Sequence, residues 1–212
     1  MVSGPEIELD LAWQQHVGLP GELLRRLVER HREPHRRYHT VGHVVWVIRH
    51  VRELVDTDGV EVADRGAVVA AAVFHDAVYE PTAPPRANEV ASASLARREL
   101  VDHGWSSERA GAVGAMIEVT VDHVAPPDTD TAVLCDADLA ILGADPAGYR
   151  AYVEQVRVEY AHVPDDAWRT GRAAVLTSFL DRDRIYATDA GRERWEAHAR
   201  ANLAAEIATL TC

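Results

Sequence analysis

Two histidines, His39 and His43, lie four residues apart in the segment RRYHTVGHVVWVIRHV. Residues at this spacing share one face of a helix, and His43 falls on a stripe with Val47, Val51 and Leu54. The imidazole of His43 is therefore expected to point into the core. A core histidine usually hydrogen-bonds a backbone carbonyl, but a neutral imidazole is also a good metal ligand. The segment by itself leaves both roles open.

Two further apolar segments carry acidic residues that are expected to be buried. His75 and Asp76 end the run VVAAAVFHD, and Asp136 and Asp138 lie within AVLCDADLAILG. A buried carboxylate without a partner costs several kcal/mol, so each of these needs an arginine or a metal ion beside it. Imidazole and carboxylate together suit a divalent ion such as Mn, Fe, Co, Ni, Zn or Mg. The coincidence of three such segments predicts one metal site.

The elements that must position these residues are all helices. Apolar residues recur at helical spacing almost throughout, and no alternating stretch is long enough for a sheet, which predicts an all-α fold of about ten helices. The expected ranges are 4 to 17, 20 to 32, 40 to 56, 64 to 79, 88 to 103, 106 to 122, 134 to 142, 146 to 162, 165 to 181 and 189 to 209.

Several helix starts carry a residue that can accept a hydrogen bond from the free amides of the first turn. These are Asp64, Asn88, Ser106, Asp145 and Asp189. The proline-rich segments at 80 to 87 and 125 to 131 are expected to be loops.

Length and composition favour one globular domain over residues 1 to 212, with 47% hydrophobic and 26% charged residues. The net charge of -12 argues against a nucleic-acid polymer or an anionic membrane as the main partner. It leaves room for a small phosphorylated substrate if a metal ion and a few arginines supply local positive charge. All 22 basic residues are arginine, which excludes Schiff-base chemistry through lysine.

No export segment and no run of about 18 uncharged apolar residues is found, so a cytoplasmic location is expected. The two cysteines, Cys135 and Cys212, lack a metal or redox spacing, which leaves histidine and carboxylate as metal ligands.

The order His43, His75-Asp76 and a late aspartate resembles the H...HD...D signature of the HD superfamily of metal-dependent phosphohydrolases. YHTVGH is similar to the segment of the cyclic-nucleotide phosphodiesterases in which the second histidine binds metal and the first is the general acid. ADL at 137 to 139 resembles the Ala-Asp-Leu around their last ligand. The resemblance implies Asp138 as the fourth ligand, with Asp136 beside it or as the alternative, and His39 as the proton donor.

Most of the chain is similar to the uncharacterised group of predicted metal-dependent HD phosphohydrolases. The similar segments are RRYHTVGHV, FHDAVYEP, NEVASAS, TVDHV, LCDADLAILG, VRVEYAHVP and GRAAVLTSFLDRDRIY. The resemblance implies hydrolysis of a phosphate ester in a small compound, such as a nucleotide, by a metal-activated water. The alternatives are another hydrolase or lyase chemistry on the same scaffold and a helical domain that senses a ligand without catalysis.

Further residues are candidates for the substrate site. Glu89 is either a general base or a favourable first-turn charge of its helix. Arg172 shares a stripe with Trp168 and Phe179, and it binds substrate or forms an ion pair with Glu159 or Asp76. The candidate substrate-binding residues are Arg36, His123, Tyr160 and Arg172.

Overall fold

The computed structural model describes residues 4–57, 59–124, 126 and 128–211. In this part of the chain every regular element is a helix, which confirms the all-α prediction. The elements are α1 (Gly4–Ala12), the π-helical η1 (Trp13–Val17), α2 (Gly21–Arg30), α3 (Val41–Val55), α4 (Arg65–Phe74), α5 (Ala87–Asp102), α6 (Ser107–Val119), α7 (Thr129–Leu139), the 3-10 helix η2 (Ala140–Gly143), α8 (Pro146–Glu159), α9 (Asp165–Leu180) and α10 (Asp189–Leu210).

Three of the predicted helix caps are confirmed. Asp64 accepts a hydrogen bond from the amide of Ala67, Ser106 accepts one from Arg109, and Asp145 accepts two in the first turn of α8. Each satisfies amides that lack a partner within the helix.

Two predicted caps are wrong. The side chain of Asn88 does not cap α5 but bonds the backbone of Glu80, which closes the proline-rich loop. At α10 the cap is Thr188 rather than Asp189, because the Thr188 hydroxyl accepts from the amide of Gly191. In both cases the neighbouring loop, and not the residue type, decides which side chain reaches a free amide.

Two helix boundaries also differ from the prediction. The helix expected from residue 134 begins at Thr129, where the carboxylate of Asp128 accepts from the amide of Thr131. The helix expected to reach residue 79 ends at Phe74, and a turn places His75 and Asp76 beyond it. His75 is the C-cap of α4, and its amide still donates to the carbonyl of Ala71, so the helical path continues up to this residue.

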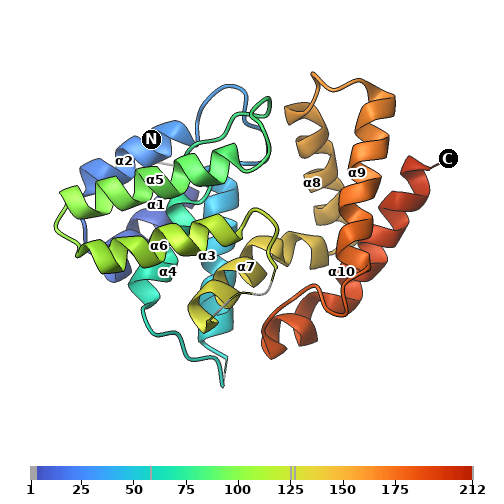
Figure 1. Cartoon of the computed structure of the whole chain (residues 1–212). Coiled ribbons are helices and arrows are strands. Elements are labelled where there is room, and N and C mark those ends of the chain that lie inside the picture. Colours follow the sequence, from blue (N-terminus) through green and yellow to red (C-terminus); the bar gives the residue numbers. More distant parts are fainter. Residues whose placement is uncertain (1–3, 58, 125, 127, 212) are drawn as a thin grey trace.

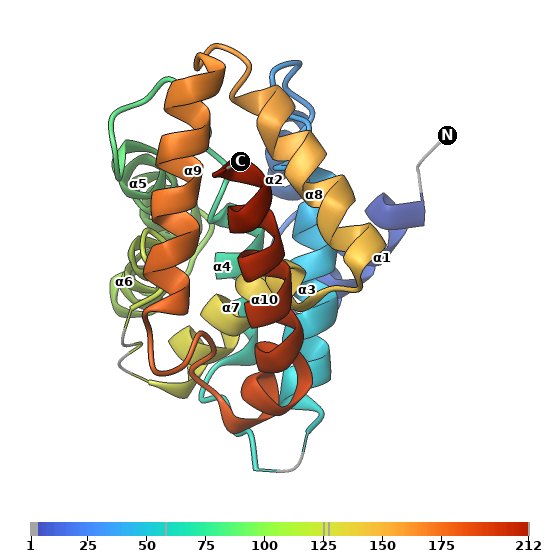
Figure 2. The ribbon, with the colours of Figure 1, turned by 90° about the vertical axis from the view of Figure 1, so that its right-hand side faces the viewer.

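The apolar helix α4 lies at the centre of the larger part of the molecule (Figure 1). All its residues from Gly66 to Phe74 are buried, and it packs against α3, α5, α6 and α7. Helices α8, α9 and α10 are grouped at the other side, and in the view of Figure 2 α10 lies between α8 and α9. One cluster of buried apolar side chains extends from Leu9 to Leu203.

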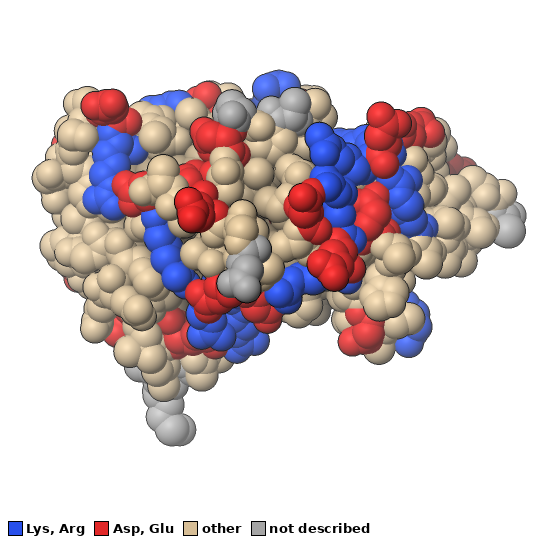
Figure 3. Space-filling view, turned by 90° about the horizontal axis from the view of Figure 1, so that it is seen from below, with Lys and Arg blue, Asp and Glu red and all other residues tan. Residues whose placement is uncertain are grey.

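The surface carries charges of both signs. On the face seen in Figure 3 acidic and basic side chains are interspersed. In the described part of the chain, none of the helices combines the length and apolar character required to cross a bilayer.

Candidate metal centre

Three helices bring two histidines and two aspartates to one point. His43 lies in the first turn of α3, His75 and Asp76 follow α4, and Asp138 lies in the last turn of α7. The Nε2 atom of His43 is 3.1 Å from Nε2 of His75, 3.1 Å from Oδ1 of Asp138 and 3.4 Å from Oδ2 of Asp76. Nε2 of His75 is 3.0 Å from Oδ2 of Asp76 and 3.6 Å from Oδ1 of Asp138.

These separations fit ligands that surround a single cation. Ligand bonds of about 2.0–2.2 Å place adjacent ligand atoms about 2.8–3.6 Å apart in octahedral or tetrahedral geometry. His43, His75 and Asp76 each offer a ligand atom within 4.8 Å of the others. His75 Nδ1 lies 2.9 Å from the carbonyl of Ala72, and a proton donated there leaves Nε2 with a lone pair for a metal.

The donors are mixed nitrogen and oxygen, and the chain's residues therefore fit a divalent transition metal or Mg. One detail departs from the usual arrangement, because Nδ1 of His43 is buried and meets no hydrogen-bond partner among the described residues.

The electrostatics of the cluster favour ionised carboxylates. Burial raises the pKa of Asp76 and Asp138, but the adjacent imidazoles outweigh burial and hold both pKa values well below their ordinary range. Burial lowers the pKa of His75, and attraction to the two carboxylates outweighs it and raises that pKa well above its ordinary value. Protons on the imidazoles thus compensate the negative charge of the carboxylates. A bound cation would replace these protons.

Asp136 lies away from this cluster. Its Oδ1 accepts a hydrogen bond from the amide of Ala187 at 2.7 Å, and its Oδ2 accepts from the amide and the hydroxyl of Thr188 at 2.8 and 2.6 Å. Residues two apart on a helix point in nearly opposite directions, so Asp136 faces α10 while Asp138 faces the imidazoles.

His39 lies beside the cluster, with its ring centroid 5.6 Å from that of His43. Its Nδ1 is 2.7 Å from Oε2 of Glu159, at the last turn of α8. The other oxygen of Glu159 accepts hydrogen bonds from the amides of residues 37 to 39, and the Tyr79 hydroxyl donates to Oε2 at 3.0 Å. The pair fixes the orientation of the His39 ring through Nδ1, and its Nε2 takes no part in this pair.

Glu159 is fully buried and still ionised. Burial raises its pKa, but the hydrogen bonds with His39 and the backbone amides lower it to about 2. From the sequence alone, Glu159 is expected only as a partner of Arg172. A signal was present, because Glu159 lies three residues after Val156 on the inward face of the predicted helix, but its partner is 120 residues away in the chain.

His123 also lies at the cluster. Its Nε2 is 2.8 Å from Oδ2 of Asp138, and its backbone has a φ of 54°, a conformation that costs free energy in a residue other than glycine. Arg182 donates to the carbonyls of Asp122 and His123 and holds this segment.

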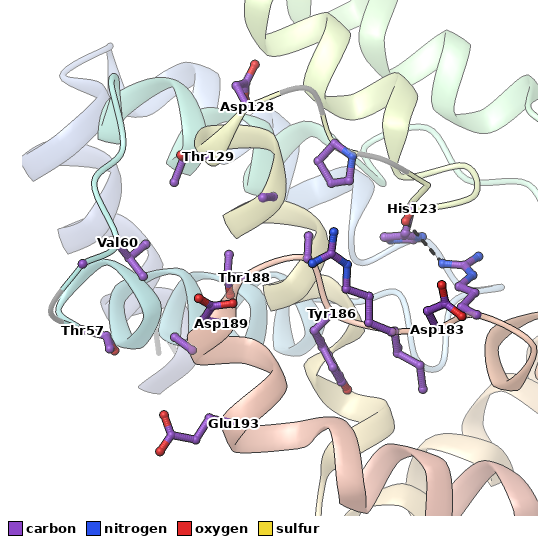
Figure 4. A pocket seen from close by; sticks show the side chains of 18 of the residues that line it. Thr57, Val60, His123, Asp128, Thr129, Asp183, Tyr186, Thr188, Asp189 and Glu193 are labelled. Atoms are coloured by element: carbon purple, nitrogen blue, oxygen red, sulfur yellow. Dashed lines mark hydrogen bonds between the residues drawn. The ribbon is translucent and has the colours of Figure 1, made fainter.

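Two cavities meet at His123. The cavity beside the cluster measures about 550 Å³ and is lined by Tyr38, His39, His123, Asp138 and residues of α8 and α9. The larger one, of about 960 Å³, lies between the start of α7 and the segment before α10 (Figure 4). Of these two cavities, only the smaller is lined by a described residue of the His/Asp cluster, Asp138, and it is therefore the candidate binding cavity.

The structure corrects the prediction for Arg36. Its side chain is fully buried, and its guanidinium donates to the carbonyls of His39, Asp76 and Ala77 and to the carboxylate of Glu33. These bonds occupy the guanidinium, so Arg36 does not reach a substrate. It instead ties the segment before α3 to the segment after α4 and thereby positions His39 and Asp76.

The predicted partners of Arg172 are also wrong. Arg172 pairs with Glu206, at 2.8 and 3.2 Å, and donates to the hydroxyl of Tyr152 at 3.1 Å. Glu206 lies on α10, which packs against α9, whereas Glu159 is the last residue of α8 and Asp76 follows α4. Arg172 still lines the smaller cavity.

Of the two remaining candidates, Tyr160 lines that cavity and Glu89 does not. Tyr160 follows α8 and lines the cavity beside Trp168, with ring centroids 5.5 Å apart. Glu89 lies in the first turn of α5 and is absent from the cavity lining among the described residues. Its Oε2 is buried and meets no hydrogen-bond partner there.

Comparisons of this chain with protein-family models, with curated proteins and with solved structures gave no match.

Proposed function

We propose that this protein is a metal-dependent hydrolase of phosphate esters in small phosphorylated compounds. The observation that carries the proposal is the convergence of His43, His75, Asp76 and Asp138 at ligand separations, with His39 beside them at the end of a cavity. The arrangement agrees with the H...HD...D resemblance of the sequence.

The four cluster residues would hold the ion. A divalent cation at this position supplies a Lewis acid for a phosphoryl oxygen and lowers the pKa of water toward neutrality. The side chains of the protein carry out the proton transfer and bind the substrate.

His39 supplies the proton for the leaving oxygen. Glu159 orients this imidazole, because its Oε2 lies 2.7 Å from Nδ1 of His39. The proton on Nε2 is then transferred toward the cavity. The neutral ring keeps its proton on Nδ1 and donates it in a hydrogen bond to Glu159. General acid catalysis of this kind contributes roughly 10²–10⁴-fold in rate.

Elemental analysis and a phosphate-release assay test the proposal. The purified protein would be assayed with Mn or Co against a panel of nucleotides and sugar phosphates. We expect turnover by the wild type, loss of both metal and turnover in His75→Ala, and loss of turnover with metal retained in His39→Ala. His103→Ala serves as the control, since His103 ends α5 and bonds only its own helix. A metal-loaded protein that releases no phosphate from any compound would refute hydrolysis.

A further inference from the structure

The cavity beside the cluster has mainly apolar walls. Aliphatic side chains of α7, η2, α8 and α9 form most of it, together with five aromatic rings. The rings are Tyr38, Tyr152, Tyr160, Trp168 and Phe179. Such walls bind a large apolar or aromatic group, because they remove its surface from water.

The walls offer little positive charge for anionic groups. The chain contains no lysine, and among the described lining residues the single arginine is Arg172. Its guanidinium is paired with Glu206 through two hydrogen bonds, and both side chains are less than 10% exposed. A second phosphate or a carboxylate in this cavity would therefore lose hydration without gaining a counter-charge.

One polar group in the cavity wall, the hydroxyl of Tyr38, lacks a hydrogen-bond partner among the described residues. This hydroxyl is buried, and the Tyr38 ring lies 4.8 Å from the His43 ring and 4.7 Å from the Tyr152 ring. Leaving a buried hydroxyl unpaired is unfavourable, because the group has lost its hydrogen bonds with water. An ester or phosphoryl oxygen of a ligand at the cluster would satisfy it.

We infer that the substrate is a phosphate ester with a single phosphate group, whose alcohol part is a bulky apolar or aromatic group held between α8 and α9. This inference rests on the proposed function and specifies its substrate class. The phosphate lies at the cluster, and the apolar part occupies the aromatic cavity. The reaction is hydrolysis: the bond between phosphorus and the ester oxygen breaks, water supplies the new oxygen, and the alcohol leaves with a proton.

Three alkyl phosphates with leaving alcohols of similar acidity separate size from charge. They are ethyl phosphate, 2-phenylethyl phosphate and 2-(4-carboxyphenyl)ethyl phosphate. We expect kcat/KM for 2-phenylethyl phosphate to exceed that for ethyl phosphate by roughly 10–100-fold, since a buried phenyl ring contributes through its apolar area. The carboxylated compound should be at least about tenfold poorer than 2-phenylethyl phosphate because its charge must be desolvated.

A substitution at Gly171 tests where the apolar group binds. Gly171 lies on α9 and lines the cavity, and a Cβ atom there would meet nothing within 4 Å. Gly171→Leu should therefore fold normally and reduce kcat/KM for 2-phenylethyl phosphate by about tenfold or more, with little change for ethyl phosphate. Gly111→Leu is the matched control, because Gly111 also lies within a helix with free space around it and lines none of the described cavities.

The outcomes distinguish the two proposals. Equal kcat/KM for ethyl and 2-phenylethyl phosphate, preference for the carboxylated compound, or an unchanged ratio in Gly171→Leu would overturn the substrate class and leave phosphate-ester hydrolysis standing. Failure of the metal-loaded protein to hydrolyse any of the three, or any compound of the wider panel, would overturn both.

Discussion

Replacing Glu159 by glutamine tests the support of His39 most directly. In the structure one oxygen of Glu159 accepts from the amides of Arg37, Tyr38 and His39, and the other accepts from Tyr79 and His39 Nδ1. Glutamine keeps an oxygen for the three amides but presents an NH₂ group to the other two donors. Two donors then face each other, so the His39 ring must change its tautomer or turn away.

The size of the effect on stability follows from the pKa of Glu159. Burial raises this pKa, but the hydrogen bonds with His39 and the backbone outweigh burial and lower it from the ordinary 4.5 to about 2. A carboxyl group with this difference contributes about 3 kcal/mol to the free energy of unfolding at pH 7. For a domain of this length we expect Tm to fall by about 6–12 °C in Glu159→Gln.

The pH dependence has a definite sign. Because the pKa of Glu159 is lower in the folded protein, its stabilisation is complete above about pH 4.5 and is lost as the pH falls toward 2. The stability difference between wild type and Glu159→Gln should therefore shrink from about 3 kcal/mol at pH 7 to about 1 kcal/mol at pH 3.

Urea unfolding at the two pH values, metal content and turnover together form the assay. Glu159→Gln should retain metal, because Glu159 touches none of the four proposed ligands in the described structure, and lose roughly 10²–10⁴-fold in kcat. Glu154→Gln replaces an exposed residue on the same helix and should leave stability, metal content and turnover unchanged. A variant with wild-type stability and turnover would refute the reasoning about the His39 pair.

Four other substitutions give further expectations. His75→Ala should lose the metal and also lower the Tm of the metal-free protein, because Asp76 and Asp138 lose a buried partner, and full metal content in this variant would contradict the role of His75 as a ligand. Asp138→Asn should lower the metal content, whereas Asp136→Ala should keep the metal. Asp136→Ala should instead lower the free energy of unfolding by about 2–4 kcal/mol, since it leaves two backbone amides and a hydroxyl without their acceptor. Equal metal loss in both variants would contradict this assignment. Arg172→Ala should cost about 3–5 kcal/mol because it leaves the buried carboxylate of Glu206 unpaired, and calorimetry that shows no change would refute a structural pair.

The helices could be predicted from the sequence because their causes are local. Apolar spacing and turn residues lie within a few positions of the element they determine, so eight of the ten predicted ranges match helices of the structure to within a few residues. The errors arose where a loop intervened, as at Asn88, whose amide bonds Glu80 across the proline segment. The early end of α4 at Phe74 likewise depends on the turn that follows it.

The sequence by itself determined the helical class and the kinds of ligand that three apolar segments could offer. Only the tertiary structure decided that Asp138 faces the imidazoles and Asp136 faces Thr188. It also decided that the guanidinium of Arg36 donates to backbone carbonyls and that Glu159 orients His39. The physical reason is the range of the interactions. A helix follows from neighbours a few residues apart, whereas a buried charge takes its partner from whichever segment packs against it, which in the pair of His39 and Glu159 lies 120 residues along the chain.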